Sequence, residues 1–259
     1  MSGSDWGAGA SGPGARAPIA VALDGPDRST VLAWAGAAGP HVAVMKVGLE
    51  TFLRDGPQIV GEVRSAAPGT GLFLDLKLHD IPNTVAGAAR SVAPLAPEYL
   101  TVHASGGPAM VAAAARALPG TRITAVTILT SLSEADLDVV GLRGPAIEAA
   151  VRLARMAVAN GAAAIVCSPQ EVAAIRAEVP SSTVLITPGV RPASGAGSAL
   201  GDQSRVATPE QALDAGADLL VIGRPITGAA DPGVAARGLA ELLAARGSRP
   251  AGALGGGLR

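Results

Sequence analysis

The 259-residue chain contains a single cysteine, Cys167, which excludes an internal disulfide framework and a multi-cysteine metal site. Two long uncharged stretches, residues 29–45 and 156–170, are interrupted by glycine, proline, histidine or asparagine, so neither predicts a membrane span. Residues 1–17 lack the apolar segment of a signal peptide. The 20 basic and 21 acidic residues nearly cancel, which argues against a surface for nucleic acid or anionic lipid. Together these absences predict a soluble cytoplasmic protein.

Lysine is also scarce. The 20 basic residues comprise 18 arginines and only two lysines, Lys46 and Lys77. Such an arginine-biased, Ala- and Gly-rich composition is typical of a GC-rich coding bias, which replaces lysine wherever arginine will serve. The two lysines that remain are therefore candidates for a task that requires a compact, titratable ammonium group.

Eight apolar runs that end in turn residues predict strands, and segments such as 109–117, 146–160 and 209–215 between them predict helices. The predicted strands are Pro18–Asp24, Val42–Gly48, Leu72–Leu78, Tyr99–Ala104, Ile123–Leu129, Ala163–Ser168, Thr183–Gly189 and Asp218–Arg224. Near-continuous apolar strands are typical of a parallel sheet that helices cover. Eight alternating units in about 240 residues predict a (β/α)8 TIM barrel. A doubly wound open sheet is the alternative, because periodicity cannot show closure.

One domain is expected. The barrel would span residues 18–245, between Gly/Ala-rich tails at 1–17 and 246–259 that we expect to be flexible. Within it, Thr208 followed by Pro209 predicts a helix start, since a hydroxyl cap precedes proline at the first helical position.

The stretch from Asp75 to Asp80 carries the strongest indication of a site. Strand alternation places Phe73, Asp75 and Lys77 on one face and four leucines on the other. The leucine face suits packing against helices, so the charged face would point into the barrel near its catalytic C-terminal end. The same alternation turns Lys46 inward from the preceding strand. These groups predict an active site, and the alternative is a structural ion pair that fills the barrel.

Two weaker candidates follow other strands. Asp24 ends the first predicted strand and is either a site residue or a turn residue before Gly25. Thr130 and Ser131 follow the fifth strand, and their hydroxyls either face a ligand or cap the next helix near Ser133. The residues alone leave both questions open.

Small and basic residues after the seventh and eighth strands predict a phosphate site. Residues 187–192 (Thr-Pro-Gly-Val-Arg-Pro) leave the seventh strand, and Gly223 and Arg224 end the eighth. Free backbone N–H groups and arginines at this place commonly bind a substrate phosphate in such barrels. The stretch between Arg191 and Gln203 is a candidate lid. The alternative is an ordinary polar loop with surface arginines.

Metal and nucleotide-cofactor motifs are not found. The three histidines are scattered and have no metal-ligand spacing, and neither a dinucleotide-binding GxGxxG nor a Walker A loop is present. His103 lies near the predicted mouth, where a structural role is at least as plausible. The residues therefore give no indication of a metal site or of a dinucleotide- or P-loop-type cofactor site.

Taken in order across about residues 18–228, these pieces resemble the orotidine 5'-phosphate decarboxylase family. The matching segments are Ala-Leu-Asp24, Lys46-Val-Gly, Asp75-Leu-Lys77-Leu-His-Asp80-Ile-Pro-Asn-Thr84, Thr-Val-His103-Ala, Thr130-Ser131, Pro-Gly-Val-Arg191-Pro, Gln203 and Ile-Gly-Arg224. The DxKxHDIPNT segment is highly specific, so the resemblance is closer than that of one generic barrel to another.

The resemblance implies a homodimeric, cofactor-free TIM-barrel enzyme of pyrimidine synthesis that converts orotidine 5'-phosphate to UMP and CO2. It implies that Lys77 donates a proton to C6 of the pyrimidine, that Asp75 holds Lys77, and that Asp80 and Thr84 act across the dimer interface. The remaining carried-over roles concern substrate binding. They are Asp24 and Lys46 at the ribose, Ser131 at the pyrimidine edge, Thr130 as a further substrate-binding residue, Gln203, Gly223 and Arg224 at the phosphate, and Arg191 in the closing region.

Two other functions remain as alternatives. Mg2+-dependent keto-sugar-phosphate decarboxylases or aldolases of the same barrel type share the DxKxxD pattern, but they use an acidic residue at the end of the second strand. Here that position is Lys46, which would repel the metal. The second alternative is a non-catalytic barrel that only binds a nucleotide.

Overall fold

A computed structural model describes residues 16–191 and 207–247 of the chain. Gln203, the candidate lid and all but the innermost residues of the two predicted tails lie outside the described residues.

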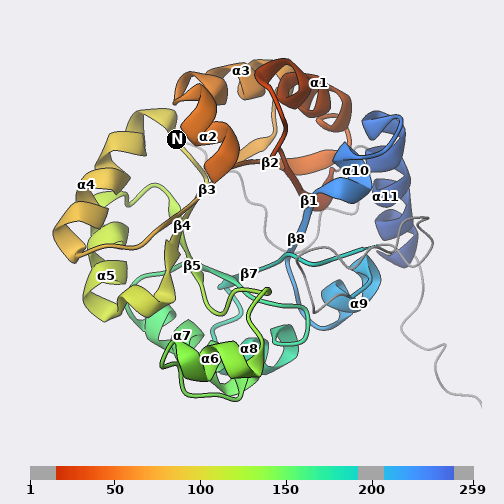
Figure 1. The fold of residues 1–259 in the computed structure, drawn as a ribbon. Helices are drawn as coiled ribbons and strands as arrows, with labels where there is room; N and C mark the ends of the chain where they lie inside the picture. The colour runs from red at the N-terminus through yellow and green to blue at the C-terminus, as the bar shows by residue number, and fades with distance from the viewer. Residues whose placement is uncertain (1–15, 192–206, 248–259) are drawn as a thin grey trace, which may run out of the picture.

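Eight parallel strands close into a barrel in the order of the sequence (Figure 1). They are β1 (Ala17–Ala22), β2 (Val42–Gly48), β3 (Gly71–Leu78), β4 (Tyr99–His103), β5 (Arg122–Val126), β6 (Ala164–Val166), β7 (Val184–Thr187) and β8 (Leu219–Ile222). β1 pairs with β8 as well as with β2, and this pairing closes the sheet. The predicted (β/α)8 barrel is confirmed, and the doubly wound alternative is wrong.

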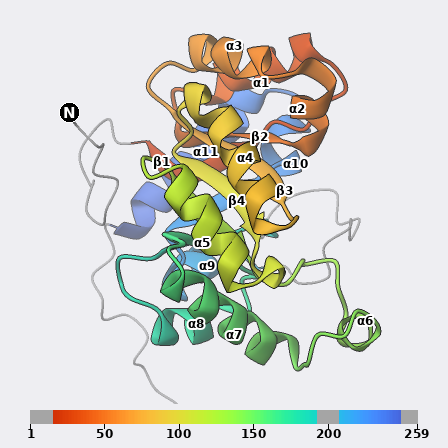
Figure 2. The ribbon, with the colours of Figure 1, turned by 90° about the vertical axis from the view of Figure 1, so that its left-hand side faces the viewer.

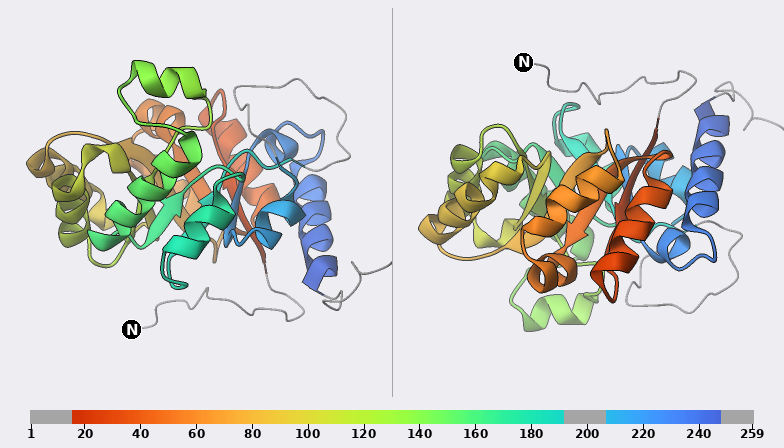
Figure 3. Two further views of the ribbon diagram at one scale, coloured as in Figure 1. Left: turned by 90° about the horizontal axis from the view of Figure 1, so that it is seen from below. Right: turned by 90° about the horizontal axis from the view of Figure 1, so that it is seen from above.

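Helices surround the barrel, as the end-on view and the views from below and above show (Figures 1 and 3). They are α1 (Arg28–Ala38), α2 (Leu49–Asp55), α3 (Gln58–Ala66), α4 (Pro82–Val92), α5 (Pro108–Ala117), α6 (Glu134–Val139), α7 (Ala146–Ala159), α8 (Val172–Glu178), α9 (Pro209–Asp214), α10 (Arg224–Thr227) and α11 (Pro232–Gly247), with 3-10 turns η1 (Ala93–Leu95) and η2 (Ala104–Gly106). The short helix α6 stands away from the body of the barrel (Figure 2). In the described part of the chain, no helix is long and apolar enough to cross a membrane.

Local signals in the sequence explain where several helices begin. Thr208 caps α9 as predicted, and its hydroxyl accepts a hydrogen bond from the Gln211 N–H. Ser133 caps α6 in the same way through Asp136. Since Ser133 fills the capping position, neither Thr130 nor Ser131 is the N-cap of that helix.

The barrel has an inner and an outer apolar layer. Phe73, Tyr99 and Ile186 belong to the cluster inside the barrel, whereas Leu72 and Leu74 belong to the larger core between strands and helices. The alternation predicted for β3 is therefore confirmed, with leucines toward the helices. Filling the lower barrel with apolar side chains leaves its C-terminal mouth for polar groups.

The upper part of β3 departs from a regular strand. Leu74 pairs with Leu100 and Leu78 with Val102, so four steps along β3 match two along β4. Within this irregular segment Lys77 has φ 47°, a left-handed conformation that is uncommon for a residue with a side chain. Such strained backbone is concentrated at functional sites.

Candidate active site

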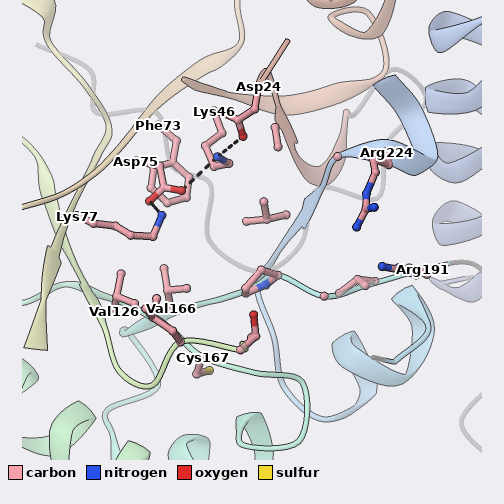
Figure 4. A pocket seen from close by; sticks show the side chains of 18 of the residues that line it. Asp24, Lys46, Phe73, Asp75, Lys77, Val126, Val166, Cys167, Arg191 and Arg224 are labelled. Carbon is pink, nitrogen blue, oxygen red and sulfur yellow. Dashed lines mark hydrogen bonds and ion pairs between the residues drawn. The ribbon is translucent and has the colours of Figure 1, made fainter. Parts of the chain in front are cut away.

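A cavity of about 300 Å³ opens at the C-terminal ends of the strands (Figure 4). Residues at or just after the ends of all strands except β4 line it. Its volume lies at the lower end of the range of small-molecule sites. The cavity is therefore at the place where (β/α)8 enzymes bind their substrates.

Four charged side chains form a continuous array along one wall of the cavity. Lys46 Nζ lies 3.3 Å from Asp24 Oδ2 and 3.1 Å from Asp75 Oδ2. Lys77 Nζ lies 2.8 Å from Asp75 Oδ1. Asp75 therefore bridges the two lysines, and all four side chains line the cavity. Asp24, which the residues alone left open between a site residue and a turn residue, lies beside Lys46.

The array keeps its charges despite burial. Burial raises the pKa of the Asp75 carboxyl, but the neighbouring charges of Lys46 and Lys77 outweigh this effect and lower the pKa to about 2. Burial also disfavours the charged form of Lys46, whose side chain is 7% exposed, yet Asp75 and Asp24 raise its pKa overall. Asp75 and Lys46 are therefore ionised at neutral pH.

Thr101 on β4 belongs to this array and was missed in the sequence. Its hydroxyl accepts a hydrogen bond from the Lys77 N–H at 2.8 Å and donates to Asp75 Oδ1 at 3.1 Å. A threonine within an apolar strand gives no signal by itself. The signal available was its position two residues before His103, which places it on the inward face of the strand.

Arginines lie on the side of the cavity opposite the lysines (Figure 4). Arg191 follows β7 and Arg224 follows β8, and both line the cavity together with Gly189 and Gly223. A guanidinium group suits a phosphate oxygen, and Gly223 precedes the start of α10. The structure thus brings the predicted cationic groups of β7 and β8 to one wall, while Gln203 lies outside the described residues.

The side of the cavity formed at the ends of β5 and β6 is apolar. Val126, Val166 and Cys167 lie there (Figure 4). Cys167 is buried, as expected for a small hydrophobic residue, and burial raises the pKa of its thiol. A substrate that spans the cavity from the lysines to the arginines would therefore meet cations at both ends and an apolar surface along one side.

Ser131, Asp80 and Thr84 are predicted site residues that do not line this cavity. Ser131 is exposed, although its neighbour Thr130 does line the cavity. Asp80 and Thr84 are also exposed and lie outside it, after β3 and at the start of α4. Within one chain, the structure therefore does not join these three side chains to the charged array.

Two histidines lie beside the array. The rings of His79 and His103 are 5.2 Å apart between centroids. Burial, with added repulsion from His79 and Lys77, lowers the pKa of His103. His79, the residue directly after the end of β3, is exposed. Among the described residues, no group of three or more His, Cys, Asp or Glu side chains could hold a metal ion.

Comparison with known proteins gives the same family for nearly the whole barrel. The model of the "Orotidine 5'-phosphate decarboxylase / HUMPS family" matches residues 17–239. A relative from Thermobifida fusca (strain YX), named orotidine 5'-phosphate decarboxylase, is 65% identical over 234 residues, which cover 90% of this chain and 99% of the relative. A relative of the same name from Frankia casuarinae is 56% identical over 251 residues, 91% of this chain and 90% of its own.

A solved structure agrees with these sequence relatives. The crystal structure of orotidine 5'-phosphate decarboxylase from Lactobacillus acidophilus superposes with a TM-score of 0.72 at 33% identity, and the match covers 86% of this chain and 97% of that one. With the fold, the charged array and these matches in agreement, the chain belongs to the orotidine 5'-phosphate decarboxylase / HUMPS family.

Proposed function

We propose that this protein is a cytoplasmic orotidine 5'-phosphate decarboxylase, which converts orotidine 5'-phosphate to UMP and CO2 in pyrimidine nucleotide synthesis. The observation that carries the proposal is the Lys46–Asp75–Lys77 array on one wall of a cavity whose opposite wall carries Arg191 and Arg224. The high identity to relatives with that name supports it.

The reaction requires a cation where the leaving carboxylate departs. When the bond between C6 and the carboxylate breaks, its electron pair remains on C6, and the pyrimidine ring delocalises this charge poorly. An ammonium group beside C6 stabilises the developing carbanion electrostatically. Lys77 then transfers a proton from Nζ to C6 as a general acid, and the neutral amine regains a proton from solvent.

Asp75 has two tasks in this mechanism. Its carboxylate fixes Lys77 Nζ at 2.8 Å, which orients the proton donor. Its negative charge, secured by a pKa of about 2, also lies beside the carboxylate of the bound substrate and disfavours that group in the ground state. Lys46, held by Asp24 and Asp75, then binds the ribose hydroxyls together with Asp24.

Contacts with the substrate phosphate contribute to catalysis although the phosphate does not react. Arg191, Arg224 and the Gly223 N–H bind the phosphate, and Gln203 completes this group. Contacts with a part of the substrate that does not react can support closure and orientation at the part that does. Ser131 contacts the pyrimidine edge, and Thr130, which lines the cavity, also contacts the substrate.

We propose further that two chains complete each active site. Asp80 and Thr84 face solvent rather than the cavity of their own chain, and between them Ile81 exposes 65% of its surface. An exposed apolar side chain beside polar groups suits contact with a second copy of the chain. In the dimer, Asp80 and Thr84 reach the partner's charged array, where Asp80 extends the alternation of acid and base.

The Mg2+-dependent alternative fits the site less well. Lys46 occupies the position at the end of β2 where those enzymes place an acidic metal ligand, and it is held as an ammonium by two carboxylates. A divalent cation there would meet a fixed positive charge. The geometry therefore favours a reaction in which the protein's own lysines supply the positive charge.

The test is turnover of orotidine 5'-phosphate by the purified protein, followed by ultraviolet absorbance with excess EDTA. We expect rapid conversion to UMP. Activity only on a keto-sugar phosphate after Mg2+ is restored would refute the proposal in favour of the metal-dependent enzymes. Tight UMP binding without turnover would refute it in favour of a nucleotide-binding barrel.

Mixing two inactive variants tests the shared site. Lys77→Ala and Asp80→Ala each remove one essential group, but a mixed dimer contains one site with both groups intact. We expect activity to appear when the two variants are mixed and allowed to exchange chains. No activity after exchange has been demonstrated by mass spectrometry would contradict the action of Asp80 across an interface.

A further inference from the structure

We infer that Thr101 is a positioning residue for the decarboxylation, because a single hydroxyl fixes both the backbone of Lys77 and the carboxylate of Asp75. The inference rests on the proposed function for its catalytic meaning. Its geometric basis is independent of that function.

The hydroxyl of Thr101 is fully buried and uses both of its hydrogen-bonding roles. It accepts the Lys77 N–H at 2.8 Å and donates to Asp75 Oδ1 at 3.1 Å, and the residue has no exposed surface. The two partners are two residues apart on β3, and both point to the same atom. Thr101 thus joins the main chain of the proton donor to the side chain that holds its ammonium group.

The irregularity of β3 explains why a side chain is needed here. Between the pairs Leu74–Leu100 and Leu78–Val102 the two strands are out of step, so the regular ladder of backbone hydrogen bonds is interrupted. A buried N–H without a partner is costly, and the Thr101 hydroxyl supplies the acceptor for Lys77. It thereby stabilises the left-handed conformation of Lys77, with φ 47°.

The same hydroxyl limits how the Asp75 carboxylate can turn. Oδ1 receives hydrogen bonds from Lys77 Nζ and Thr101, while Oδ2 faces Lys46. Rotation of the carboxylate would break at least one of these contacts. Thr101 therefore holds the orientation of a group on which the position of the Lys77 ammonium depends, and a displacement of about 1 Å at a reacting group can cost on the order of 100-fold in rate.

Thr124 offers a matched control. It lies opposite Thr101 in the pairing of β4 with β5 and is equally buried, but its hydroxyl donates to the Arg122 carbonyl of its own strand. Thr101→Val and Thr124→Val remove the same hydroxyl from the same kind of position and keep the same shape. Of the two substitutions, only Thr101→Val removes a hydrogen bond to the charged array.

Kinetics provide the first test. We expect Thr101→Val to lower kcat by about 10- to 100-fold, the range expected when a hydrogen bond to a charged group is lost. The dissociation constant of UMP should stay within about threefold of the value for the unchanged protein, because the substitution does not touch the arginines proposed to bind the phosphate. Thr101→Ser, which keeps the hydroxyl, should have a kcat within a few-fold of that of the unchanged protein. Thr124→Val should have the same kcat as the unchanged protein.

A spectroscopic test needs no substrate. Since the chain has only two lysines, protein labelled at lysine Nζ should give two ammonium signals, assigned by their loss in Lys46→Ala and Lys77→Ala. Thr101→Val should shift or broaden the Lys77 signal, whereas Thr124→Val should leave both in place. If Thr101→Val does not fold, Thr101→Ala against Thr101→Ser makes the same comparison.

The outcomes separate the two proposals. If the unchanged protein fails to decarboxylate orotidine 5'-phosphate, the proposed function is wrong, and the ammonium signals still test the positioning. If that protein is active but Thr101→Val and Thr124→Val have the same kcat and the same signals, the inference is overturned. It is also overturned if both variants lose kcat and UMP affinity in equal proportion, because that result shows only general damage to the barrel.

Discussion

Replacing Asp75 with asparagine would remove the negative charge that the two lysines share while preserving the shape of the side chain. The pKa of Asp75 falls from 3.8 to about 2 in the folded protein, although burial alone would raise it. At about 1.36 kcal/mol per pKa unit this difference contributes on the order of 2–3 kcal/mol to folding at neutral pH. Because Lys46 is buried and also loses a partner, we expect Asp75→Asn to lower the free energy of unfolding by about 2–4 kcal/mol.

The pH dependence follows from the direction of the shift. A carboxyl whose pKa is lowered on folding contributes fully above its unfolded value and loses that contribution as pH falls toward its folded value. The extra stability of the unchanged protein should therefore persist down to about pH 4 and disappear between about pH 4 and pH 2. Denaturant unfolding followed by circular dichroism, at fixed protein concentration and a series of pH values, measures both quantities.

An exposed ion pair provides the control. Glu148 pairs with Arg152 at 3.9 Å on the surface of α7, and its side chain is 66% exposed. Glu148→Gln should change the free energy of unfolding by less than about 1 kcal/mol at every pH. The reasoning is refuted if Asp75→Asn is as stable as the unchanged protein at pH 7, or if the difference between them is the same at pH 3 as at pH 7.

Three further predictions concern other parts of the cavity. Lys77→Ala should lower kcat by at least about 100-fold while calorimetry still detects UMP binding. A kcat similar to that of the unchanged protein would exclude Lys77 as the proton donor. Arg224→Ala should weaken UMP binding by about 10- to 100-fold and leave uridine binding unchanged, whereas an equal loss for both ligands would contradict a phosphate contact. Cys167, with 1% of its surface exposed and a pKa raised by burial, should react with a thiol reagent only after unfolding. Rapid labelling of the native protein would show that the Cys167 thiol is accessible to solvent in the folded state.

Strand patterns in the sequence were sufficient to predict the inward face of the barrel. β2 has the predicted bounds, and on β3 the alternation correctly separates the charged side chains from the leucines. The apolar run of β5 was predicted to continue to Leu129, but the strand ends at Val126. The reason is that Ile128 and Leu129 line the cavity instead of pairing in the sheet, and hydropathy cannot distinguish these two ways of covering apolar surface.

Other features depend on contacts that no local pattern encodes. The left-handed conformation of Lys77 arises where β3 and β4 are out of register, which requires knowledge of both strands at once. Thr101 was missed for the same reason, since its partners lie 24 and 26 positions away in the sequence. The exposure of Asp80 was likewise not determined by the strand period, because β3 ends at Leu78.

The two lysines look equivalent in the sequence, but the structure gives them different capacities. Lys46 lies between two carboxylates, at 3.3 and 3.1 Å, and its side chain is 7% exposed, so the raised pKa holds its proton firmly. Among the described residues, the one carboxylate within ion-pair distance of the Lys77 ammonium is Asp75, and its side chain is 29% exposed at the cavity wall. A proton donor must reach its acceptor and release the proton there. Of the two groups Lys77 is therefore suited to protonate the substrate, while Lys46 is suited to keep Asp75 charged.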